Sequence, residues 1–200
     1  MITFDAGKQG TLSMDEPKKD GFRKLLNSEL NRIGTEEFKN SRKSPIVLVL
    51  DNIRSQHNIG SAFRSADAFA VEKIVLCGIS ATPPSAEIRK AALGAEESIE
   101  WEYEKETSDA VEKLRSKGYT IIAVEQTENA TMLDNFIPQK GERYALVFGN
   151  EVNGVAQGVV DMSDLTIEIP QLGTKHSLNV SVSIGVVLWE IVIAGADKKI

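Results

Sequence analysis

From Pro45 onward, short apolar runs alternate with segments of helical periodicity, and this alternation constrains the fold more than any other feature of the sequence. The run 46–50 (IVLVL) is apolar at every position, as expected of a strand that is buried on both faces of a sheet. Further runs of this kind lie at 73–77, 119–124, 144–148 and 165–169. Such a pattern predicts an α/β fold, a mostly parallel sheet flanked by helices.

The segments between these runs have the periodicity and the punctuation of helices. We expect helices over residues 59–70, 87–93 and 108–117, with Asn58 as the N-cap of the first and Ser108 of the last. Ser177 is the predicted N-cap of a long apolar helix that closes the chain. The segment 99–103 is expected to form an edge strand.

The first 44 residues lack the alternation of apolar runs and helical segments that is seen in the rest of the chain. Residues 1–19 are polar and are expected to be poorly ordered. Asp20 is a plausible N-cap for a helix whose apolar positions would be Phe22, Leu25, Leu26, Leu30 and Ile33, and a short second helix is expected to open at Thr35. We therefore predict a polar, helical extension over 1–44, too short for a separate substrate-binding domain, and one domain over 45–200.

Composition favours a soluble, cytoplasmic protein that folds without disulfides or metals. The content of 42% hydrophobic and 26% charged residues is ordinary for a globular protein. The single cysteine, Cys77, lies in an apolar run and is interpreted as a core residue in a reducing compartment. The first residues lack the apolar core of a signal peptide, and the apolar stretch 178–195 is better explained by a buried helix than by a membrane span. The two histidines are scattered, so no metal site is predicted.

The net charge of −6 argues at first against a nucleic-acid partner, because such partners usually require a basic surface. The distribution of the charges weakens that objection. Residues 1–44 carry nine basic and seven acidic side chains, and much of the remaining acidity lies between Glu96 and Glu106. Charge alone therefore neither supports nor excludes RNA as a partner.

Three loops that follow predicted strands, 51–60, 149–155 and 170–179, are rich in glycine, asparagine and charged residues. Ligands of α/β sheets bind beyond the carboxyl ends of the strands, so these loops are the candidate site. Near the first loop, Arg64 follows Asn58 by six residues, about 120° away around a helix. An isolated arginine at this position would more often be a surface residue, or one in a salt bridge near Asp67.

The other two loops hold further polar candidates. Gly149 and Gly154 frame a tight loop with open backbone groups around Glu151, although the pattern alone is weak and a lone glutamate is more often a solvated carboxylate. Asn179 is an amide at the start of an otherwise apolar helix, where it needs partners if it is buried.

Three segments occur in order along the chain: NIGSAFRSAD at 58–67, LVFGNEVNGV at 146–155 and IEIPQLGTKHSLNVSVSIG at 167–185. Together they resemble the three motifs of the SpoU/TrmH family of SPOUT methyltransferases, and the resemblance covers about residues 45–195. The resemblance implies transfer of a methyl group from S-adenosylmethionine to a ribose 2′-hydroxyl of tRNA or rRNA. It also implies a C-terminal deep trefoil knot that forms the cofactor pocket, and a homodimer whose two subunits complete the active site.

The resemblance assigns roles by position. The positions that would hold the cofactor, largely through backbone atoms, are Gly149, Ile169 and Leu178, and the glycine loop that ends at Gly154 belongs to the same site. The positions that match the polar residues of the active site are Asn58, Arg64, Glu151, Ser177 and Asn179.

The chemistry requires that the proton of a neutral ribose hydroxyl be weakened or removed as the methyl carbon approaches. His57, beside Asn58, is one candidate base, whereas the resemblance places Arg64 near the hydroxyl. Because a guanidinium is effectively never deprotonated, Arg64 is better suited to bind phosphate and to stabilise the developing alkoxide. Glu151 and Asn179 would orient Arg64 or the ribose. The identity of the base stays open at this point.

Three other functions are compatible with parts of the sequence. A SPOUT enzyme that modifies a base is disfavoured by the first and third motifs, and a non-catalytic RNA-binding or assembly factor by the presence of every matched polar residue. A nucleotide-dependent dehydrogenase is disfavoured because no G-x-G-x-x-G follows the first strand.

Overall fold

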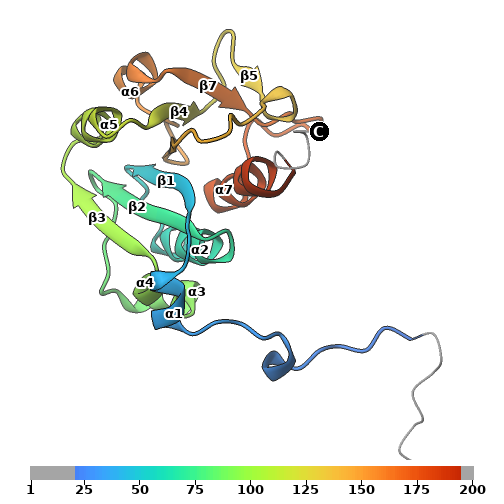
Figure 1. The fold of residues 1–200 in the computed structure, drawn as a ribbon. Helices are drawn as coiled ribbons and strands as arrows, with labels where there is room; N and C mark the ends of the chain where they lie inside the picture. Colours follow the sequence, from blue (N-terminus) through green and yellow to red (C-terminus); the bar gives the residue numbers. More distant parts are fainter. Residues whose placement is uncertain (1–20, 195–200) are drawn as a thin grey trace, which may run out of the picture. The chain divides into compact units, whose positions relative to one another are not determined.

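The computed structural model of the chain describes residues 21–194 (Figure 1). The chain divides into two units, one that ends at Ile33 and one that begins at Gly34. The predictions made for residues 1–19 and for Asp20 as a helix cap lie outside the described residues, as does the chain beyond residue 194.

The second unit is built on a seven-stranded sheet in which every pair of neighbouring strands is parallel. The strand order is β3-β2-β1-β6-β4-β7-β5. The strands are β1 (Ser44–Asp51), β2 (Val71–Cys77), β3 (Glu100–Glu104), β4 (Thr120–Val124), β5 (Thr131–Met132), β6 (Tyr144–Gly149) and β7 (Leu165–Glu168). The predicted parallel α/β sheet is confirmed, with β3 at one edge as expected, whereas the two-residue β5 at the other edge was not predicted.

Helices cover both faces of the sheet (Figure 1). One face carries α1 (Thr35–Asn40), α2 (Gln56–Ala68), α3 (Ala86–Ala92), α4 (Ala95–Ser98) and α7 (Val180–Leu188), which continues as the π-helical segment η3 (Trp189–Ala194). The other face carries α5 (Thr107–Ser116) and α6 (Gln157–Met162). In β1, Leu48 and Leu50 face the first layer, and Val47 and Val49 face the second. The apolar run is thus buried on both sides, as predicted.

Cys77 lies at the carboxyl end of β2 and has no exposed surface. Burial raises the pKa of its thiol to about 12. A thiol that stays protonated at neutral pH is a poor nucleophile, so the interpretation of Cys77 as a core residue is confirmed.

The predicted helix after Asp20 is wrong over the described residues. Residues 21–33 contain only the single 3-10 turn η1 (Asn27–Glu29), and Phe22, Leu26 and Ile33 are exposed. An isolated helix of this length is marginal in water without a surface on which to bury its apolar face, which explains the difference. The short helix expected at Thr35 is confirmed as α1, and its Phe38 is buried in the core of the second unit.

Three helix caps differ from the predicted ones. Ser55 caps α2 by accepting a hydrogen bond from the Asn58 backbone N–H, and α5 begins after Glu106 instead of Ser108. Asn179, not Ser177, caps α7, because its side-chain oxygen accepts from the Ser181 backbone N–H at 2.9 Å. These shifts leave the side chain of Asn58 available for contacts beyond its own helix.

Candidate active site

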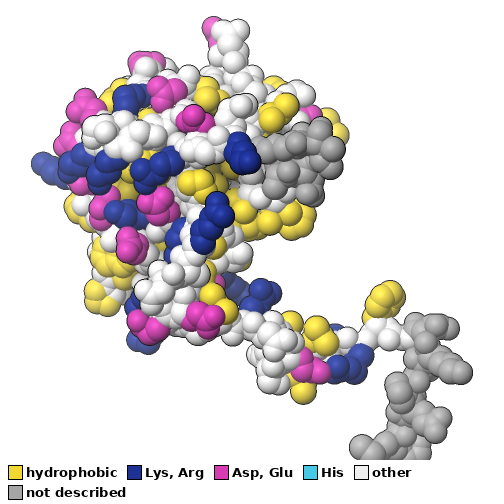
Figure 2. All heavy atoms as spheres, viewed as in Figure 1, with side chains coloured by type: hydrophobic (Ala, Val, Ile, Leu, Met, Phe, Trp, Pro, Cys, Tyr) yellow, Lys and Arg dark blue, Asp and Glu magenta, His cyan; other side chains and the backbone are white. Residues whose placement is uncertain are grey.

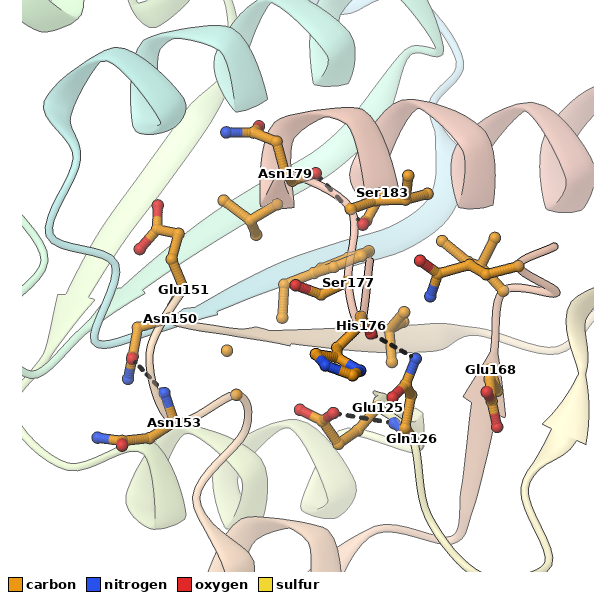
Figure 3. Close-up of a pocket in the computed structure, with 18 of the residues that line it drawn as sticks. Glu125, Gln126, Asn150, Glu151, Asn153, Glu168, His176, Ser177, Asn179 and Ser183 are labelled. Carbon is orange, nitrogen blue, oxygen red and sulfur yellow. Dashed lines mark hydrogen bonds between the residues drawn. The ribbon is translucent and has the colours of Figure 1, made fainter. Parts of the chain in front are cut away.

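A pocket of about 450 Å³ lies at the carboxyl ends of β4, β6 and β7, three strands that are neighbours in the sheet (Figure 3). Among its lining residues are seven of the nine sequence-predicted site residues: Gly149, Glu151, Gly154, Ile169, Ser177, Leu178 and Asn179. The structure therefore brings the second and third motifs together around one cavity. Asn58 reaches its edge by hydrogen bonding, and Arg64 lies elsewhere.

The loop after β6 turns back, so that its end at Gly154 and Val155 packs against its beginning at Gly149 and Asn150. Asn150 and Gly154 form a β-bridge, and the Asn150 side-chain oxygen accepts from the backbone N–H groups of Val152 and Asn153 at 3.0 and 2.9 Å. A Cβ on Gly149 would lie 1.9 Å from the carbonyl carbon of Gly154 and 2.0 Å from the nitrogen of Val155. Only glycine at position 149 permits this crossing of two backbone segments.

Two carboxylates at the ends of β1 and β4, the strands on either side of β6, hold the end of this loop. Glu125, directly after β4, accepts a hydrogen bond from the Val155 N–H at 2.8 Å, and Asp51, at the end of β1, accepts from the Ala156 N–H at 3.0 Å. Gly154, with φ of +66°, lies so close to Glu125 that an added Cβ would be 2.1 Å from the carboxylate oxygen. A turn of this kind requires a residue without a side chain.

Three polar side chains from three motifs form one hydrogen-bonded chain. Asn179 donates from its side-chain amide to Asn58 Oδ1 at 3.2 Å, and Asn58 donates in turn to Glu151. Only 7% of Asn58 is exposed, so its amide needs the partners that Glu151 and Asn179 supply. Asn179 therefore has two roles at the start of the apolar α7: it caps the helix, and it donates a hydrogen bond to α2.

Arg64 and His57 do not face this pocket. Both are exposed on α2 and line a second hollow, which α3 completes. The salt bridge between Arg64 and Asp67 that the sequence also allowed is not formed within residues 21–194. The Asp67 carboxylate accepts from the Ser98 hydroxyl at 2.7 Å, and no carboxylate among the described residues pairs with Arg64.

Sequence reasoning missed the contribution of β4 to the pocket. Glu125 and Gln126 line it, and Gln126 donates from its side chain to the backbone oxygen of His176 at 2.9 Å. In Figure 3 these two residues lie across the pocket from Asn179. Their position directly after a predicted strand was the available indication, since every parallel strand delivers its following loop to the same edge of the sheet.

The pocket has the character of a site for an organic ligand. Its walls combine apolar side chains, such as Phe148 and Ile167, with open backbone of two loops and with carboxylate and amide groups. Within residues 21–194, no group of three or more histidine, cysteine, aspartate or glutamate side chains is arranged to hold a metal ion. Over the same residues, none of the helices has the length and apolar character that crossing a bilayer requires.

Comparison with known proteins identifies the family. The sequence model of the SpoU rRNA Methylase family matches residues 45–189, which contain all three motifs. The chain belongs to this family. This membership confirms the resemblance seen in the sequence.

Individual relatives agree with this assignment. The chain is 29% identical over 167 residues to the 23S rRNA (guanosine-2′-O-)-methyltransferase RlmB of Neisseria meningitidis, an alignment that covers 83% of this chain and 66% of that protein. This SpoU-family chain thus spans about two thirds of the length of that relative. It superposes on the TrmH/SpoU tRNA modifying enzyme of A. aeolicus with a TM-score of 0.70 at 24% identity, covering 82% of this chain and 83% of the other.

A third similar protein is the AdoMet-bound rRNA methyltransferase of Sinorhizobium meliloti. The TM-score is 0.70 at 24% identity, and the match covers 82% of this chain and 60% of that one. At this level of identity the likeness establishes a shared fold.

Proposed function

We propose that the protein transfers a methyl group from S-adenosylmethionine to a ribose 2′-hydroxyl of tRNA or rRNA. The observation that carries this proposal is the single pocket at which the second and third family motifs meet, with Asn58 of the first motif bonded at its edge. The names of the similar RlmB and AdoMet-bound enzymes support the reaction and the cofactor.

The residues of the pocket fit S-adenosylmethionine. The open backbone around Gly149 and the residues Ile169 and Leu178 offer donors, acceptors and apolar contacts for an adenosine, and Gly154 keeps the loop clear of side chains. S-adenosylmethionine supplies a methyl group that its sulfonium already activates, so the protein must chiefly align the reactants and manage one proton. No metal is part of the proposed mechanism.

The polar chain and Arg64 have separate roles in the proposal. Asn58, Glu151 and Asn179 hold one another in a fixed arrangement and would orient the ribose beside Ser177 at the mouth of the pocket. Arg64 would bind the adjacent phosphate and stabilise the charge that develops on the 2′-oxygen. His57 lines the same hollow as Arg64, so a placement that brings Arg64 to the ribose brings His57 near it as well, and His57 remains a candidate base.

A homodimer is part of the proposal, because Arg64 does not face the pocket of its own chain. We place Arg64 of one subunit beside the pocket of its partner. The surface that supports pairing is an apolar stripe along α7 and η3, exposed to 38–56%: Val182, Val186, Trp189 and Ile193. Their spacing puts them on one side of the helix, and apolar side chains gather over this region in Figure 2.

Val186→Glu tests the dimer. A carboxylate buried without a partner costs about 3–5 kcal/mol, so the dissociation constant should rise by more than about a hundredfold. Sedimentation at micromolar concentration should show a dimer for the unaltered protein and a monomer for the variant. Ile79→Glu, at a residue 60% exposed at the carboxyl end of β2, is the matched control and should stay dimeric. A monomeric unaltered protein would contradict the proposal.

Three further features belong to the proposal. Residues 1–44 would be an extension and residues 45–200 the methyltransferase domain, a division supported by the family match from residue 45. A deep trefoil knot in the C-terminal part would bring segment 170–179 against the loop after β6, and both line the same pocket. The buried, protonated thiol of Cys77 is compatible with a cytoplasmic location.

Mapping of ribose methylation in total RNA from cells with and without the gene tests the function. We expect the loss of methylation at one nucleotide or a small set of nucleotides, and its return when the gene is restored. A gene carrying Asn179→Ala, which removes one link of the polar chain, should fail to restore it. Identical maps in both cells, for a protein that is expressed, would contradict the proposed reaction.

A further inference from the structure

The hollow beside Arg64 differs in chemistry from the rest of the surface. It has a volume of about 480 Å³ between α2 and α3, and none of the described residues that line it carries a carboxylate. The lining residues are His57, Ser61, Arg64, Ser65, Ala68, Phe69, Lys90 and Ala91. In a chain with 29 acidic and 23 basic residues, two cations and three further hydrogen-bonding side chains thus share one concavity whose described lining has no acidic residue.

Close packing of the two helices forms the hollow. Gly60 in α2 has no side chain, and an added Cβ would lie 2.5 Å from the carbonyl oxygen of Ile88 and 2.7 Å from the Cβ of Ala91. This approach brings Lys90 of α3 into one lining with Arg64 of α2. The glycine of the first motif thereby determines the position of a cation that lies outside that motif.

Within residues 21–194, both cations are free of carboxylate partners. Over the described part of the chain, neither Arg64 nor Lys90 forms an ion pair, whereas Arg89, next to Lys90, pairs with Glu97 at 2.9 Å. Other cations of the sheet unit are neutralised in the same way, as in the pairs of Lys73 with Glu102 and Arg143 with Glu72. Like charges in one hollow repel each other, so their arrangement is better explained by an anionic ligand than by stability.

We propose that this hollow is a phosphate site for the RNA backbone, in which Lys90 is a second binding cation beside Arg64. The inference rests on the proposed function and extends it, because it adds a residue from outside the three motifs to the substrate contacts. A guanidinium and an ammonium together suit phosphodiester oxygens, which accept charge-assisted hydrogen bonds from both. The half-buried hydroxyls of Ser61 and Ser65 supply uncharged donors beside them.

The salt dependence of RNA binding tests the site. Bulk transfer RNA serves as the probe, and the dissociation constant is measured over a range of salt concentrations. Loss of one phosphate contact lowers the slope of log K against log salt by about 0.7–0.9. Lys90→Gln should show this change together with weaker binding, and Arg64→Gln should behave alike. Lys117→Gln, an exposed lysine at the end of α5 on the other face of the sheet, changes the net charge equally and should keep the original slope.

Two further measurements separate the possible outcomes. Lys90→Gln should bind S-adenosylmethionine as the unaltered protein does, and its melting temperature should stay the same or rise, because one of two repelling charges is gone. An unchanged slope in Lys90→Gln, with RNA still bound by the unaltered protein, would overturn the phosphate site and leave the proposed function intact. If the unaltered protein binds S-adenosylmethionine and no RNA, both fail.

Discussion

Arg64→Ala should lose about 10²–10³ in the rate of methyl transfer, measured in a single turnover on the mapped RNA. Removal of a charged donor placed at a developing oxyanion typically has an effect of this size, and poorer alignment of the substrate adds to it. The affinity for S-adenosylmethionine should be unchanged, because Arg64 does not line the pocket proposed for the cofactor. The stability should also be unchanged, since the exposed guanidinium makes no ion pair with any residue of the described part of the chain.

Arg115→Ala is the matched control for this experiment. Arg115 lies in α5 on the other face of the sheet and pairs with Asp164 at 3.3 Å, so its loss should cost at most about 1 kcal/mol of stability and leave turnover unaltered. A fully active Arg64→Ala would remove this residue from the mechanism and direct attention to His57, which lines the same hollow.

Gly149→Ala should weaken the binding of S-adenosylmethionine by about tenfold to a hundredfold or more. The added methyl would lie about 2 Å from the backbone of Gly154 and Val155, and backbone cannot rotate away as a side chain can. Overpacking of this kind costs about 1–3 kcal/mol or more, and each 1.4 kcal/mol that falls on binding is a factor of ten. Isothermal titration calorimetry gives the affinity, and circular dichroism establishes that the sheet is intact.

Gly158→Ala is the control for the added methyl group. Gly158 lies in α6, and a Cβ there would meet no atom within 4 Å, so affinity should be unchanged and stability should rise slightly. Position 149 is a sharper test than position 154, where any side chain would also displace the carboxylate of Glu125. Undiminished affinity in a folded Gly149→Ala would place the cofactor outside this pocket.

The sheet could be predicted because its strands are buried on both faces. Every residue of the run 46–50 is apolar, and so is nearly every residue of 144–148, which leaves few alternatives to a parallel core. The two-residue β5 has no such apolar run. It lies at the edge of the sheet, where Thr131 and Met132 pair with β7 alone. The helix predicted for residues 21–33 was wrong for the opposite reason. Its apolar residues have helical spacing, but these side chains are exposed, so burial does not stabilise a helix there.

The sequence predicted which loops form the candidate site, but not which side chains contact one another there. Glycine and asparagine after a strand identify a loop, but no local pattern indicates that Asn179 donates to Asn58, 121 positions away. The same holds for Glu125, whose partner Val155 belongs to the loop after another strand. Arg64 could not be placed from the sequence either. The motif assigns it to an active site, and only the structure shows that it lines a second hollow and not the pocket of its own chain.

The carboxylates of Asp51 and Glu125 have a consequence for how a ligand is received. They hold the amides of Ala156 and Val155 from either side of β6, so the loop 149–156 has its shape before anything binds. Ordering a flexible backbone costs about 1–2 kcal/mol of conformational entropy per residue, and a loop that is already ordered spares an incoming ligand that loss. Association at this pocket should therefore proceed in one kinetic phase on encounter, without a slower step in which the loop closes.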